Sequence, residues 1–298
     1  MTASPGNNGL SLTTSMMNRV AVLGAVMLMP VLAAIAQDTT AVMRPTHRVI
    51  DVSVGTAAVL DTYLSPITYE GIDLGLHLDH YQATGFAPER WVRRLEAGID
   101  YARVHNPART GNIMHAVDIT ARWSLARRWH VKATQLAIGP MTDLAIGAVY
   151  NPAGSNNVVS AKARWSIGAT ASASWHTLLC HRPLTLHGAL SLPMLGVWFA
   201  PDGYESYYEI YLGNRRHLAH MAWWGNRFDM NACLAADWQL GGTTLRLIYR
   251  NRYERSTARG LKSRCWSNTV GIGIGGDFVT LSPRRPLSRY ARTVHATR

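Results

Sequence analysis

The sequence lacks long hydrophobic runs and is poor in cysteine and phenylalanine. Beyond residue 36 no apolar segment approaches the ~18–20 residues that a membrane-spanning helix requires, which excludes a helical membrane protein. The three cysteines, Cys180, Cys233 and Cys265, have no metal-ligand spacing. Their odd number allows one disulfide, and the sequence does not indicate which two of them would form it. Four phenylalanines stand against ten tryptophans and twelve tyrosines. That excess favours an interface between apolar and polar surroundings, where a ring with a polar tip is stable.

A short apolar run does occur at the N-terminus. Arg19 precedes the apolar stretch 20–29, and Ala34-Ile35-Ala36 has the small-x-small pattern of a signal peptidase site. We therefore predict a signal peptide over residues 1–36, with cleavage near Ala36 and export of the mature chain. No cysteine follows the cleavage site, which argues against a lipid-anchored lipoprotein.

Residues 159–175 alternate almost without error between apolar and polar side chains. The apolar positions are Val159, Ala161, Ala163, Trp165, Ile167, Ala169, Ala171, Ala173 and Trp175. Successive side chains of a strand point to opposite faces, so this stretch predicts one long strand with an apolar and a polar face. Trp165 and Trp175 are ten residues apart, which matches the ~9–11 that a tilted strand needs to cross a bilayer between two aromatic girdles.

Similar but weaker patterns recur along the chain and predict an all-β, antiparallel transmembrane β-barrel. Together with the long strand they make about twelve strands, and ten or eight stay open because four are weak: 67–80, 93–104, 113–125, 129–139, 143–150, 184–192, 206–212, 218–224, 228–239, 245–253 and 270–278. The predicted organisation is a signal peptide over 1–36, a lead-in segment over 37–65, the barrel over 66–281 and a basic tail over 282–298.

The lengths of the connections predict an orientation. With a periplasmic N-terminus, the long connections 81–90, 200–205 and 257–265 face outside, and the tight Gly241-Gly242 hairpin faces the periplasm. Two connections disagree with this orientation, because 105–112 is long for a periplasmic turn and 126–128 is short for an external loop.

Charged residues on the polar faces of the strands are expected to line the lumen. They carry both signs, so they favour an ion-paired, mostly closed interior over a wide pore. The set comprises Asp73, Glu96, Asp100, Asp118, Arg122, Lys162, Arg164, Asp229, Asp237, Arg246, Arg250, Arg252 and Asp277.

The formal net charge is +12, and part of it lies in the tail from Ser282, which holds five arginines and no acid. This tail either binds an anionic surface or is a disordered soluble end. A loop with Arg255, Arg259, Lys262 and Arg264 is expected where lipopolysaccharide phosphates would lie. The expected partners are outer-membrane lipid and lipopolysaccharide. Nucleic acid is not expected, no protein partner is indicated, and a monomer is predicted.

Signs of catalysis are weak, so the sequence favours a protein that is not an enzyme. The chain has no His-x-Ser, the arrangement of outer-membrane phospholipases, and no Asp-x-Asp or Asp-x-His, the strings of barrel proteases. His77 and Asp79 share one face of a strand near the rim and are the only catalytic candidates, as a general base and its orienting acid. The twelve histidines have no ligand spacing, so no metal or other cofactor is predicted.

Several local strings occur together in the order in which one family carries them. They are Asp61-Thr62-Tyr63-Leu64-Ser65-Pro66, Tyr69-Glu70-Gly71, Ser206-Tyr207-Tyr208-Glu209-Ile210-Tyr211, Gly225-Asn226-Arg227-Phe228-Asp229 and Thr244-Leu245-Arg246-Leu247-Ile248-Tyr249-Arg250. From Asp61 to Phe278 the chain resembles a family of exported proteins of unknown function from gut and oral Gram-negative anaerobes. The resemblance implies an outer-membrane barrel and brings no activity and no catalytic residues.

The leading functional hypothesis is therefore a structural or small-solute barrel of the outer membrane, or an accessory to a larger envelope assembly. One alternative is a lipid- or peptide-hydrolysing barrel with its site at the outer rim. Another is a soluble periplasmic β-protein that binds a ligand.

Overall fold

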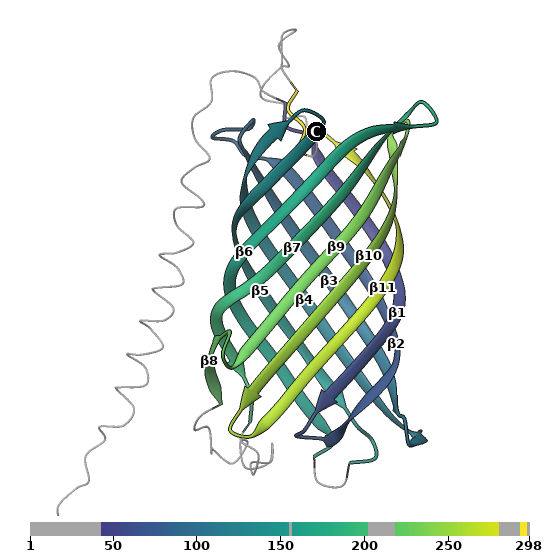
Figure 1. Cartoon of the computed structure of the whole chain (residues 1–298), viewed down its shortest axis with the longest axis vertical. Coiled ribbons are helices and arrows are strands. Elements are labelled where there is room, and N and C mark those ends of the chain that lie inside the picture. Colours follow the sequence, from purple (N-terminus) through teal and green to yellow (C-terminus); the bar gives the residue numbers. More distant parts are fainter. Residues whose placement is uncertain (1–42, 155–156, 202–217, 280–292, 297–298) are drawn as a thin grey trace, which may run out of the picture.

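The computed structural model describes residues 43–154, 157–201, 218–279 and 293–296, and within them the fold is an antiparallel β-barrel (Figure 1). Its strands are β1 (Thr46–Asp61), β2 (Ser65–Ala83), β3 (Trp91–Asn106), β4 (Arg109–Val131), β5 (Thr134–Tyr150), β6 (Val159–Leu179), β7 (Arg182–Phe199), β8 (Ala219–Trp223), β9 (Arg227–Leu240), β10 (Thr243–Ala258) and β11 (Leu261–Phe278). In the described part of the chain, no helix is long and apolar enough to cross a membrane.

Ten strands close into a ring, and β8 lies outside it. Each strand pairs with its neighbours in chain order, β7 pairs with β9, and β1 pairs with β11 from Thr46↔Phe278 to Asp61↔Ser263. The short β8 pairs only with the far end of β7. Closure of the ring gives each of its strands a neighbour on both sides, as a lipid environment demands. Direct pairing of β7 with β9 ends at Ser191↔Asn231, and beyond that point β7 pairs with β8.

The two faces of the wall have the reverse of the polarity of a soluble protein. Along β1 the outward Ile50, Val52 and Val54 are 53–56% exposed, whereas the inward Asp51 and Ser53 are buried. On β6 the outward Trp165 and Trp175 are about half exposed, one toward each end of the wall. Apolar side chains outside and polar side chains inside are the pattern of a transmembrane barrel. The predicted all-β antiparallel barrel is thus confirmed.

The two ends of the barrel differ in their connections. The end near Thr46 and Phe278, which we call the termini end, carries three two-residue turns (132–133, 180–181 and 241–242) and the connection 84–90. The opposite end, which we call the distal end, carries the connections 62–64, 107–108, 151–158, 200–218 and 259–260. The two longest connections thus lie at the distal end, which is the asymmetry expected if that end faces outside.

Two sequence-based assignments are wrong in detail. The predicted lead-in segment 37–65 contains β1, so the barrel begins at Thr46. The predicted turn at 126–128 lies inside β4, and the three candidates 113–125, 129–139 and 143–150 make only two strands, β4 and β5. The candidate 218–224 corresponds to β8, and the candidate 206–212 lies outside the described residues.

These errors explain the two connections that did not fit. Because β1 was not predicted, the first connections were assigned to the wrong end of the barrel. Because β4 and β5 were divided into three strands, the connections after them were again assigned to the correct end. The connection 84–90 therefore lies at the termini end, the same end as the Gly241-Gly242 turn, and not outside as predicted. The turn at 107–108 lies at the distal end, and the turn of β10 and β11 is only two residues long.

Candidate functional site: the ion-paired lumen

The lumen is filled by charged side chains that pair with one another. Eleven of the thirteen residues predicted to line it form an ion pair with another described residue, and Asp277 is hydrogen-bonded to His47. The exception is Asp73, which is buried and forms no ion pair within the described residues. Sequence reasoning missed further members: His47, Asp51, Asp61, Arg94, Asp143, Arg227 and Glu254.

Toward the termini end the network centres on Arg246 of β10. Its Nε donates to Asp237 Oδ1 at 2.6 Å and its Nη2 donates to Asp237 Oδ2 at 2.7 Å. Its Nη1 donates to Asp79 of β2, which also accepts from Arg94 Nη2 at 3.0 Å. Arg246 is 2% exposed. A bidentate guanidinium–carboxylate pair fixes the relative position of the strands that carry it.

In the middle of the lumen His77 of β2 lies between two carboxylates. Its Nε2 is 3.2 Å from Asp100 Oδ1 and its Nδ1 is 3.6 Å from Asp51 Oδ1. Two glycines make room for the ring, because a Cβ added at Gly75 or Gly98 would lie 2.5 Å from a ring carbon of His77. Arginines hold both carboxylates in turn: Arg250 bonds Asp51, and Arg252 Nη1 donates to Asp100 at 3.0 Å.

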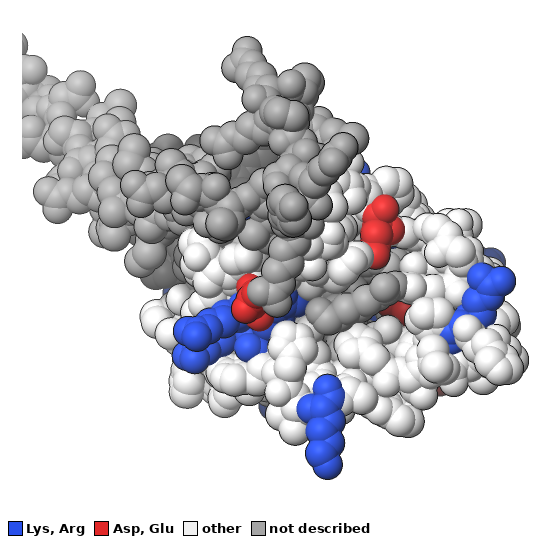
Figure 2. All heavy atoms as spheres, turned by 90° about the horizontal axis from the view of Figure 1, so that it is seen from above, with Lys and Arg blue, Asp and Glu red and all other residues white. Residues whose placement is uncertain are grey.

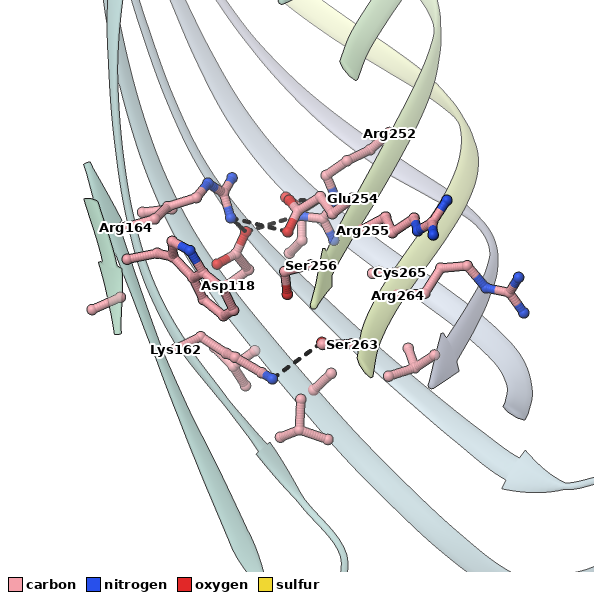
Figure 3. A pocket seen from close by; sticks show the side chains of 18 of the residues that line it. Asp118, Lys162, Arg164, Arg252, Glu254, Arg255, Ser256, Ser263, Arg264 and Cys265 are labelled. Carbon is pink, nitrogen blue, oxygen red and sulfur yellow. Dashed lines mark hydrogen bonds and ion pairs between the residues drawn. The ribbon is translucent and has the colours of Figure 1, made fainter. Parts of the chain in front are cut away.

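Toward the distal end the network centres on Arg164 of β6 (Figure 3). Its Nη1 donates to Glu254 Oε2 at 3.0 Å, and its Nε is 3.4 Å from Asp143 Oδ2 and 3.7 Å from Asp229 Oδ2. Nearby, Lys162 Nζ lies 2.6 Å from Asp61 Oδ2 and donates to Ser263 Oγ at 3.1 Å.

Three contacts join walls that are far apart around the ring. Lys162 of β6 pairs with Asp61 of β1, and Arg252 of β10 donates to Asp118 of β4 at 3.1 Å. Between β2 and β7, Tyr81 Oη lies 3.3 Å from His187 Nε2. Two of the spaces left within the lumen are cavities of about 70 Å³ each, room for only a handful of water molecules. The interior is therefore closed at several levels.

The C-terminal residues cover the termini end. The backbone N–H of Val294 donates to the Met43 carbonyl at 2.9 Å, and Arg128 Nη1 donates to the carbonyl of His295 at 2.7 Å. Ala296 is 3% exposed and packs in an apolar cluster with Tyr81, Val92, Ala126 and Ala137. Residues 293–296 thus do not behave as the disordered soluble end that the sequence left open. The tail arginines Arg284, Arg285, Arg289, Arg292 and Arg298 lie outside the described residues.

On the part of the termini end that Figure 2 leaves uncovered, basic and acidic side chains both stand at the rim. Basic side chains stand at separated points around it, with acidic side chains among them (Figure 2). The visible part of this mouth therefore has mixed charge.

The catalytic candidates are not arranged as predicted. His77 lies in the middle of the lumen, not at the rim, and its ring nitrogens face Asp51 and Asp100 instead of Asp79. Asp79 is occupied by Arg94 and Arg246. Ser263 accepts a hydrogen bond from Lys162, whose ammonium is ion-paired with Asp61, so this lysine is a donor and not a base toward the serine.

Metal and disulfide chemistry have no site in the described residues. No group of three or more His, Cys, Asp or Glu side chains converges there in a way that could hold a metal ion. All three cysteines are free: Cys180 is exposed at a turn, and Cys233 and Cys265 are partly buried.

The chain is similar to several solved outer-membrane proteins at very low sequence identity. The outer membrane protease OmpT from Escherichia coli is 5% identical, with a TM-score of 0.48 over 82% of this chain and 99% of that one. The COG4313 outer membrane channel from Pseudomonas putida F1 is 10% identical, with a TM-score of 0.33 over 82% and 98%. OprG from Pseudomonas aeruginosa is 12% identical, with a TM-score of 0.29 over 81% and 98%.

No curated protein matches the chain. The model of a family described as a protein of unknown function, DUF3316, matches residues 20–285, which is most of the chain. This match confirms the resemblance to a family of unknown function, whereas an origin in gut or oral anaerobes stays a prediction. The chain therefore belongs to the DUF3316 family of proteins of unknown function.

Proposed function

We propose that this protein is an outer-membrane β-barrel with a closed lumen, which acts as a structural component of the envelope or as an accessory to a larger envelope assembly. The observation that carries the proposal is the set of contacts between distant walls, Lys162–Asp61, Arg252–Asp118 and Tyr81–His187. A solute that passed through the barrel would have to break each of them. A wide pore is therefore disfavoured, and the polar groups of the interior serve chiefly to hold the walls together.

The surface of the wall supports the membrane location. Large apolar side chains stand exposed on strands all around the ring, among them Ile72, Ile99, Ile146, Leu247 and Ile272. A soluble periplasmic protein rarely exposes a contiguous apolar surface of this extent. Export through the predicted signal peptide leaves the termini end in the periplasm, so that the distal end, with its longer connections, faces outside.

Single-channel recording of the refolded mature protein tests the closed lumen. We expect no discrete conductance steps in a planar bilayer from protein whose folding is verified by its heat-modifiable migration on a gel. A wide porin, refolded and inserted in the same way, establishes that steps would be detected. Stable steps from the folded wild-type barrel would contradict the closed lumen and identify a small-solute pore instead.

A further inference from the structure

The outward face of β10 and β11 carries an unusual pair of arginines near the distal end. Arg255 of β10 lies directly opposite Arg264 of β11, and the next outward pair toward the rim is Thr257↔Lys262. Both arginines are exposed. Figure 3 shows their side chains directed away from Arg164 and Glu254. Like charges directly opposite on a sheet repel and destabilise it, so this placement calls for a compensating anion.

None of the described acidic side chains forms an ion pair with either arginine. The ion pairs formed at this level of β10 involve the inward Arg252 and Glu254, and none involves Arg255, Lys262 or Arg264. Arg264 Nη2 only reaches Thr68 Oγ1, at 3.5 Å. These side chains were predicted to lie on a loop. Their position on strands fixes their direction and spacing more firmly than a loop would.

The depth of the pair matches that of lipid phosphates. The outward pair just below it is Tyr253↔Trp266, and Trp266 is 52% exposed. Aromatic side chains of this kind mark the edge of the hydrocarbon region. Two further residues along a strand add roughly 7 Å, which after tilting fits within the polar zone of about 5–7 Å that flanks the hydrocarbon on each side.

We propose that Arg255 and Arg264 bind a phosphate group of lipid A, the membrane anchor of lipopolysaccharide, in the outer leaflet. A guanidinium presents a planar fork of donors that matches phosphate oxygens, and one phosphate between the two forks removes their mutual repulsion. Lys262, one rung nearer the rim, adds a third positive charge. This inference rests on the proposed membrane location, since it requires the distal end to face outside.

The surroundings favour a lipid-borne phosphate over free phosphate. The pair lies on the outer wall, above the apolar band and next to the exposed ring of Trp266. A glycolipid can pack its acyl chains on that band while its phosphate meets the arginines. A free phosphate ion would gain nothing from the band and would meet only surface charges that salt screens strongly.

The test is binding of purified lipid A to the folded barrel in detergent micelles, measured for wild type and R255Q/R264Q. Bisphosphorylated lipid A is compared with dephosphorylated lipid A, and inorganic phosphate is the competitor. R93Q/R127Q is the matched control, because Arg93 and Arg127 are exposed, outward-facing and near the opposite rim. R255K/R264K keeps the charge and loses the fork.

We expect bisphosphorylated lipid A to bind at least about tenfold more weakly to R255Q/R264Q than to wild type or the control, equivalent to roughly one charge-assisted hydrogen bond. Equal binding of both lipids, or unchanged binding by R255Q/R264Q, would overturn the site. Displacement by millimolar inorganic phosphate would overturn the lipid source. A barrel that folds but binds both forms of lipid A equally contradicts only this inference. A barrel that fails to insert into bilayers contradicts the proposed function.

Discussion

Replacement of Arg246 by methionine is expected to destabilise the barrel by about 3–5 kcal/mol, the usual cost of removing one partner of a buried ion pair. Methionine has a similar length, so the change leaves little cavity. It does leave the Asp79 and Asp237 carboxylates without the guanidinium that both of them contact. Urea unfolding of the refolded protein in lipid vesicles measures the effect.

Two further variants separate lost pairing from general damage. R103M changes the same residue type at an exposed position on β3, and should stay within about 0.5 kcal/mol of wild type. Adding D237N to R246M removes the carboxylate that loses its bidentate partner, whereas Asp79 keeps its bond to Arg94, and should recover a large part of the loss. A cost below about 1 kcal/mol for R246M would mean that water reaches these carboxylates, against a closed lumen.

Replacement of Val54 by arginine is expected to cost about 2–4 kcal/mol when the barrel is unfolded from lipid vesicles. Val54 faces outward in the middle of β1 and is 56% exposed. In a bilayer this position meets hydrocarbon, where a guanidinium is poorly solvated. In a soluble protein the same position would meet water, and an arginine would be tolerated.

Val131 provides the matched control, because it is 58% exposed and is the last residue of β4, beside a turn at the termini end. V131R should cost no more than about 1 kcal/mol, since charges near the membrane interface are tolerated. Equal and small costs for V54R and V131R would refute the membrane location and favour a soluble periplasmic protein.

The alternation of side chains predicted the strands wherever only one face of the wall is apolar. Residues 159–175 fall within β6 for this reason. β1 was not predicted as a strand, because its second half is apolar on both faces. Ala57 and Val59 point inward into a small apolar cluster with Tyr69 and Val104, which erases the two-residue period.

The boundary between β4 and β5 was missed for a different reason. The turn there uses Lys132 with a φ of +56°, a residue type that does not signal a turn. Within the predicted turn, Ala126 is buried inward, and Arg128 points inward to bond the C-terminal backbone. Their role depends on residues 293–296, which no local pattern could reveal.

The sequence predicted which charged side chains face the lumen, but not which of them pair with one another. A two-residue period assigns each charged residue of a strand to one face or the other, and this placed the thirteen residues inward. The partners of those charges are set by position around the ring. Arg246 and Asp79 are 167 residues apart in sequence, and Arg250 and Asp51 are 199 apart. The sequence alone gives no measure of which distant strands face each other, so His77 could not be placed between its two carboxylates.

The clasp between the chain ends has a mechanical consequence. The junction of β1 and β11 joins the first and last strands, and it is where a barrel could part sideways to admit another strand or a lipid. Here Met43, just before β1, pairs with Thr293 beyond β11, and the residues that follow are anchored through Arg128 to β4. Separating β1 from β11 at the termini end therefore also requires these contacts to break, so the chain ends reinforce the closure of the ring at that end.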